Sequence, residues 1–195
     1  MKQPILLVVL CASFLISCGQ KNKLSEEDYT WMPYKGNETL VFKSNTGETD
    51  TIFILKKDTL WSYPEAQALN GKEYEVVAVF GTPSSLNQEG AGKRYDLFKV
   101  QKAKDNRAEL VFDLSARGAV FYRLTPVKID SLSTVKPVTV QTSSGEYDDV
   151  YMILPDDYAK DFYDRNNFVT KLYWSKSSGL IRYDKKDNVY WELLK

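Results

Sequence analysis

Side chains able to do covalent or acid–base chemistry are few in this 195-residue sequence, which has two cysteines, Cys11 and Cys18, and no histidine. A Ser-His-Asp triad needs an imidazole, and structural zinc sites need thiolates or imidazoles. A general base working near neutral pH would therefore be a carboxylate or a lysine with a shifted pKa. The sequence predicts no cofactor, no metal site and no catalytic residue that a motif identifies.

Acidic side chains are densest between positions 148 and 164. Carboxylate oxygens are the ligands that Ca²⁺ prefers, but the spacing lacks the glycine and the terminal bidentate glutamate of an EF-hand loop. We therefore expect a solvated acidic surface rather than a calcium site. The residues concerned are Asp148, Asp149, Asp156, Asp157, Asp161 and Asp164.

Ser133 and Lys136 match the S-x-x-K pattern, in which a serine and a lysine share one face of a helix. Pro137 and the β-branched Thr134 and Val135 disfavour a helix at this point. We expect the match to be accidental. A glycosidase needs only two carboxylates at a set separation, so a carboxylate-dependent hydrolase remains an alternative.

Aromatic residues make up 13% of the chain, with four tryptophans and 13 tyrosines. Aromatic rings bind sugars and peptides by stacking, but strands also bury them in cores. Trp174 and Trp191 alternate with leucines and are expected in the core. Trp31 and Trp61 remain as possible binding aromatics.

The first eighteen residues have the pattern of a segment that is processed by other enzymes. Lys2 precedes an apolar run from 5 to 16, which is the layout of a secretory signal. The run is too short to span a bilayer, which needs about 20 apolar residues. We expect residues 1–17 to be removed as a signal peptide.

Leu15, Ile16, Ser17 and Cys18 resemble the lipobox of bacterial lipoproteins: an aliphatic residue, a tolerant position, a small residue and cysteine. The resemblance implies that Leu15, Ile16 and Ser17 are recognised by the signal peptidase and that the Cys18 thiol carries a diacylglycerol. Two or three acyl chains anchor a protein stably, at ~0.8 kcal/mol per buried methylene. The alternative is an ordinary signal peptide with an accidental cysteine.

The same resemblance bears on location. Gly19 stands where an aspartate would resemble the inner-membrane retention signal, so we expect a cell-envelope protein anchored in the outer membrane. The acids after Cys18 arrive late, at Glu26, Glu27 and Asp28, so the periplasmic face is favoured over the cell surface. The membrane is the first expected partner, through the acyl chains on Cys18.

Charge and length limit the remaining partners and the domain count. The chain has 26 basic and 26 acidic residues and no basic stripe, which excludes nucleic acid as an expected partner. Residues 18–28 are polar and lack periodicity, so they are expected to form a lipidated flexible tether. Residues 29–195 are expected to form a single β-rich domain.

Short runs rich in Val, Ile, Phe, Tyr and Thr, bounded by Gly, Asn, Asp and Pro, predict a mainly β fold. The expected architecture is an antiparallel meander, a sandwich or an open barrel-like sheet. Ser44 to Glu48 is expected to join strands 38–43 and 50–55 into a hairpin. One or two short helical turns are expected, at 155–167 and at 64–69.

Two stretches resemble uncharacterised β-rich envelope lipoproteins: Trp31-Met32-Pro33-Tyr34 and the run from Tyr173 to Tyr183. The resemblance supports the β fold and implies no activity. Together with the missing histidine and thiols, it leads to a non-catalytic, membrane-anchored protein that binds an envelope protein or a glycan. The alternative is the carboxylate-dependent hydrolase, acting on an envelope glycan.

Overall fold

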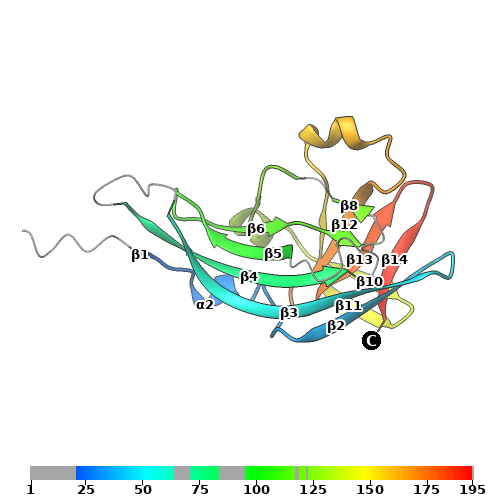
Figure 1. Cartoon of the computed structure of the whole chain (residues 1–195), viewed down its shortest axis with the longest axis horizontal. Coiled ribbons are helices and arrows are strands. Elements are labelled where there is room, and N and C mark those ends of the chain that lie inside the picture. Colours follow the sequence, from blue (N-terminus) through cyan, green and yellow to red (C-terminus); the bar gives the residue numbers. More distant parts are fainter. Residues whose placement is uncertain (1–20, 64–70, 84–94, 117–118, 122, 195) are drawn as a thin grey trace, which may run out of the picture.

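The structure is a computed structural model, and it describes residues 21–63, 71–83, 95–116, 119–121 and 123–194. The fold is mainly β, as predicted: a 12-stranded sheet curves into an open half-barrel (Figure 1). The described residues also form three short helices, α2 (Glu26–Tyr29), α3 (Ile129–Ser133) and η1 (Asp157–Phe162). No helix in these ranges is long and apolar enough to cross a membrane.

Two antiparallel meanders make up most of the sheet. The first contains β2 (Glu38–Ser44), β3 (Thr49–Ser62), β4 (Glu73–Pro83), β5 (Tyr95–Lys102) and β6 (Ala108–Phe112), with β9 (Val127–Lys128) beside β6. The second contains β10 (Val138–Thr142), β11 (Gly145–Ile153), β12 (Val169–Ser175), β13 (Gly179–Lys185) and β14 (Tyr190–Leu194). β14 pairs with β2, so the last strand joins the two meanders into one surface.

The two strands predicted with bounds, 38–43 and 50–55, are both present, and their ends differ from the prediction. The hairpin around Ser44 to Glu48 is confirmed, with Gly47 at φ +93° where glycine is favoured. β3 continues well past the predicted end at Leu55, because its pairing with β4 extends to Ser62. β7 (Ser115–Ala116) and β8 (Ala119–Val120) form a separate small hairpin.

Of the two predicted helical turns, 155–167 contains η1, and 64–69 lies outside the described residues.

The flexible tether predicted for 18–28 is wrong for the part that the structure describes. β1 (Lys21–Asn22) pairs in parallel with the start of β4, and only three residues separate it from α2. Ser25 caps α2, and Leu24 is buried because its side chain joins the main core. This Ser-x-x-Asp capping box is short, which is why hydrophobic periodicity did not reveal it.

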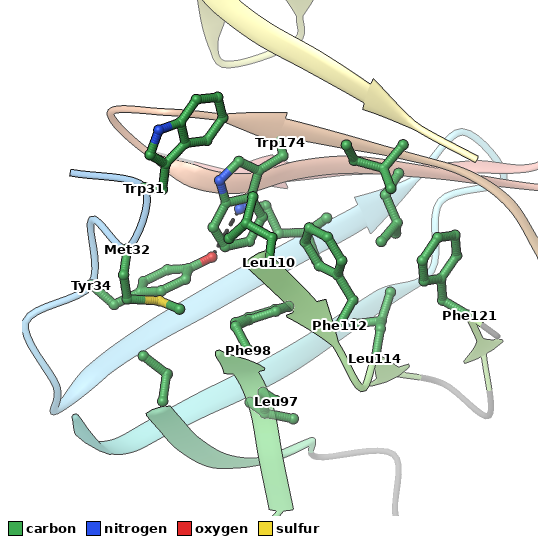
Figure 2. Packing of buried hydrophobic residues seen from close by; sticks show 14 of the residues in the cluster. Trp31, Met32, Tyr34, Leu97, Phe98, Leu110, Phe112, Leu114, Phe121 and Trp174 are labelled. Carbon is green, nitrogen blue, oxygen red and sulfur yellow. Dashed lines mark hydrogen bonds between the residues drawn. The ribbon is translucent and has the colours of Figure 1, made fainter. Parts of the chain in front are cut away.

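The main core fills the concave side of the sheet (Figure 2). It brings together residues 31–34 and the run from Tyr173 to Tyr183, the two stretches that resemble envelope lipoproteins. The Tyr34 ring stacks on Phe98 at 5.5 Å and meets the edge of Trp174 at 6.0 Å. Trp174 in turn contacts Phe98 and Phe112, each at 5.2 Å between ring centroids. Aromatic rings from four distant segments therefore lock the two meanders together.

Candidate functional site

Two adjoining hollows meet at Thr170 on strand β12, at the end of the molecule formed by the second meander. The apolar hollow has a volume of about 340 Å³ and is lined by Leu154, Pro155, Tyr163, Phe168, Thr170 and Lys186. The polar hollow has a volume of about 310 Å³ and is lined by Thr170, Arg182, Asp184, Lys185, Asn188, Val189 and Tyr190.

Arg182 is the centre of the polar hollow. Its Nε donates to Asp184 Oδ1 at 2.7 Å, and its Nη1 donates to Glu192 Oε1 at 3.3 Å. Asp184 Oδ2 also accepts from the Tyr173 hydroxyl at 2.9 Å, and Glu192 Oε2 accepts from the backbone N–H of Ser143 at 3.1 Å. Both carboxylates are therefore engaged on both oxygens, which makes them positioning groups rather than free nucleophiles.

Two tyrosine rings hold the guanidinium of Arg182. Its central carbon lies 4.0 Å from the ring centroid of Tyr190 and 5.1 Å from that of Tyr173. Burial, followed by the hydrogen bond to Asp184, raises the pKa of Tyr173 to about 12. Tyr173 is therefore a neutral donor at physiological pH. Together with Glu192 it lies behind the hollow and holds Arg182 and Asp184, which line it, in place.

The apolar hollow is built where the chain returns from η1 to β12. Phe168 is buried, and Tyr163 packs on it with 5.0 Å between ring centroids. Lys186 stands at the rim and pairs with Asp164 at 3.7 Å, in an exposed contact of little energetic weight. The walls of the apolar hollow are suited to an apolar group of a ligand. The charged side chains at its rim are suited to a polar group beside it.

Exposed apolar side chains extend from this hollow over two neighbouring segments. Tyr158 on η1 is 67% exposed, Leu154 is 54% exposed and Leu124 is 59% exposed. The segments are tied together, since Arg123 Nη1 donates to the carbonyl of Leu154 at 2.8 Å and the N–H of Thr125 donates to Asp156 Oδ2 at 2.8 Å. Clustered exposed apolar groups with a charged rim are typical of a contact surface.

Comparisons were made with protein-family models, curated proteins and solved structures. None of them matches the chain. What the hollows bind is therefore inferred from their own chemistry.

The predicted site residues do not come together at these hollows. Leu15, Ile16, Ser17 and Cys18 lie outside the described residues. Trp31 was predicted as a possible binding aromatic, but its side chain is only 1% exposed and packs in the core, where it cannot contact a ligand.

Trp61 is half-buried near β1, with the Lys21 ammonium 5.1 Å from the centroid of its ring.

The acids between 148 and 164 serve local turns and surface pairs. Asp149 accepts from the Ser175 hydroxyl at 2.6 Å and from the N–H of Ser177 at 2.7 Å. Asp157 pairs with Lys160 at 3.4 Å. In the described part of the chain, no three acidic, cysteine or histidine side chains are grouped to hold a metal ion.

The S-x-x-K match is not held on one helix. Ser133 is the last residue of α3 and its hydroxyl donates to the carbonyl of Ile129 at 3.1 Å, so Lys136 lies beyond the helix.

Sequence reasoning missed the Arg182 network, although Tyr173 and Arg182 both lie in the run from Tyr173 to Tyr183 whose resemblance supported the β fold. Their opposition depends on a register shift between β12 and β13, at Tyr173 and Trp174. The available signal was that Arg182 and Asp184 flank the core residue Tyr183 on the second face of one strand.

Proposed function

We propose that this chain is a lipid-anchored cell-envelope protein that binds a partner protein, without catalysis, through the two hollows. The observation that carries the proposal is the apolar hollow, with its exposed rim, directly beside the rigid polar hollow. An apolar side chain of a partner fits the first, and its neighbouring backbone or polar groups match the donors and acceptors of the second. Glycan binding is less favoured, since Leu124 and Leu154 add aliphatic surface that a sugar uses poorly.

The anchor rests on the lipobox resemblance of Leu15 to Cys18. On that basis the acyl chains of Cys18 enter the outer membrane, with the domain on its periplasmic face. Figure 1 supports a division of labour, because β1 lies at one end of the long axis, whereas β12 to β14 and η1 lie at the other. The hollows would then point away from the lipid.

A carboxylate-dependent hydrolase acting on an envelope glycan is the second candidate, and Asp113 is the residue that favours it. Partial burial of the carboxyl group raises the pKa of Asp113, the Lys99 ammonium lowers it and the Asp96 carboxylate raises it again, with a net rise. The residue as a whole is exposed, however, which limits the shift that water allows. A raised carboxyl pKa is what a general acid requires. Asp96, the one carboxylate that acts on Asp113 among the described residues, is itself paired with Lys99 at 3.0 Å.

The anchor is tested by mass spectrometry of the N-terminal peptide and by labelling cells with a fatty acid. A diacylglycerol on Cys18 as the first residue is expected, and Cys18→Ser should abolish the label. An unmodified Cys18, or cleavage elsewhere, would end the lipoprotein proposal.

The partner is tested by photo-crosslinking in cells, with the crosslinker at Tyr158 of the full chain. Capture of one identified envelope protein is expected, with loss on Leu154→Asp and retention on Val135→Asp. The control is matched, since Leu154 is 54% and Val135 57% exposed. Capture of a glycan alone would replace the protein partner, and hydrolysis of an envelope glycan that Asp113→Asn abolishes would favour the enzyme.

A further inference from the structure

The distance between the lipid-bearing residue and the folded domain is very short. Only Gly19 and Gln20 separate Cys18 from Lys21, the first residue of β1. The three steps from the Cα of Cys18 to the Cα of Lys21 span at most about 10 Å when the chain is fully extended. The headgroup layer on one side of a bilayer is itself about 5–8 Å thick. On the lipid anchor proposed above, the β1 end of the sheet has almost no freedom to leave the membrane surface.

β1 is also fixed to the domain rather than loosely attached. Asn22 Nδ2 donates to the carbonyl of Glu73 at 3.2 Å, and the N–H of Leu24 donates to the buried Glu75 carboxylate at 2.8 Å. The chain therefore cannot peel away from β4 to lengthen the tether without losing these bonds. The flexible connection between the lipid and the domain therefore extends only from Cys18 to Lys21.

The side chains gathered at this end are those that favour a headgroup layer. Trp61 is half-buried and lies under the Lys21 ammonium, 5.1 Å from the ring centroid. Tyr63, two positions along the chain, is 53% exposed. Tryptophan and tyrosine rings are enriched at membrane interfaces, and lysine side chains extend their charge to the headgroups.

We propose that the β1 end of the sheet rests on the bilayer that holds Cys18, with Trp61 and Tyr63 in the headgroup layer. The occupant of this surface is phospholipid in general rather than anionic lipid, because its charges are mixed. Exposed Lys21, Lys23 and Lys72 stand near Glu26, Glu27 and the half-buried Glu73, which pairs with Lys21 at 3.5 Å. The contact fixes the orientation of the domain and turns the two hollows away from the lipid.

The test uses the mature acylated protein in vesicles of phosphatidylcholine brominated on its acyl chains near the headgroup, compared with unbrominated vesicles. Trp31, Trp174 and Trp191 are at most 1% exposed, so Trp61 is the tryptophan placed to be quenched by contact. Partial quenching of the emission is expected. It should disappear in Trp61→Phe and return when Tyr63→Trp is added to that variant.

A tryptophan at the far end is the matched control. Tyr158→Trp in the Trp61→Phe background adds an exposed emitter on η1, which brominated lipid should not quench. Quenching as strong at position 158 as at 61 or 63, or no quenching at all of vesicle-bound protein, would overturn the proposed orientation. Protein that fails to float with the vesicles would instead contradict the lipid anchor, so the two failures are distinct.

Discussion

The hydroxyl oxygen of Tyr34 accepts a hydrogen bond of 2.9 Å from the backbone N–H of Leu180, across 146 positions of sequence. Burial raises the pKa of Tyr34, so the hydroxyl stays neutral. Because this bond ties the segment before the first meander to β13, the fourth strand of the second meander, we expect it to support the whole fold.

Tyr34→Phe should lower the free energy of unfolding by about 1–3 kcal/mol, because the buried N–H of Leu180 loses its acceptor. Chemical denaturation of the two proteins measures the difference. Tyr158→Phe, on the exposed η1, is the control and should change stability by less than about 0.5 kcal/mol. Equal stability of Tyr34→Phe and the parent would show that the bond contributes nothing.

Gly179→Ala should destabilise the protein by at least about 2 kcal/mol, for two reasons. Its φ of +79° disfavours any Cβ, and that Cβ would overlap the Tyr34 ring and hydroxyl. Gly47→Ala separates the two effects, since Gly47 has φ +93° and open space around it. Thermal unfolding should rank Gly179→Ala as clearly worse; the same loss for both would rule out the overlap.

Glu75→Ala should loosen the N-terminal segment. The buried carboxylate of Glu75 accepts from the N–H of Leu24 and from the Tyr29 hydroxyl. Its removal leaves the buried N–H of Leu24 unpaired, at a cost of about 1–3 kcal/mol, whereas the partly exposed Tyr29 hydroxyl can turn to water. Hydrogen exchange of residues 21–29 should accelerate. Glu73→Ala breaks only the half-exposed pair with Lys21, worth about 0–1 kcal/mol, and should leave exchange at Leu24 slow.

Ionisation of the Tyr173 hydroxyl should lower the free energy of unfolding at alkaline pH. Burial and Asp184 raise its pKa from 10.0 to about 12 in the folded protein. Its contribution is therefore present below pH 10 and is lost as the pH rises through 12. Other tyrosines titrate here too, so the measurement is the difference between parent and Tyr173→Phe in urea between pH 9 and about 12. The decline should be shallower in the variant, and parallel curves would contradict the raised pKa of Tyr173.

The two tryptophans proposed from sequence should respond differently to truncation. Trp31→Ala removes a ring that is 1% exposed and should cost about 3–5 kcal/mol. Trp61→Ala, at a half-buried edge position, should cost about 1 kcal/mol or less. Denaturant midpoints of the two variants compare them directly, and a larger loss for Trp61 would contradict the half-buried position of its ring.

The strands and the hairpin at Gly47 were predictable because alternation of apolar residues and glycine at a positive φ act within a few residues. The β1 and α2 segment was not, because its order depends on Glu75, a residue more than 45 positions away. The burial of Trp31 was unpredictable for the same reason. Its ring is aromatic in any context, but only the packing of Tyr151 and Lys176 around it decides that it is buried.

By itself the sequence determined the mainly β fold, the absence of imidazole chemistry and the lipobox resemblance at Cys18, since each depends on residue type and local order. The tertiary structure alone decided that Arg182 meets Tyr173, Asp184 and Glu192, because that contact requires a register between three strands, including the shift beside Trp174. It also decided that Thr170 separates an apolar from a polar hollow. Pairing register and packing are sums over distant contacts, and no local pattern in the chain encodes them.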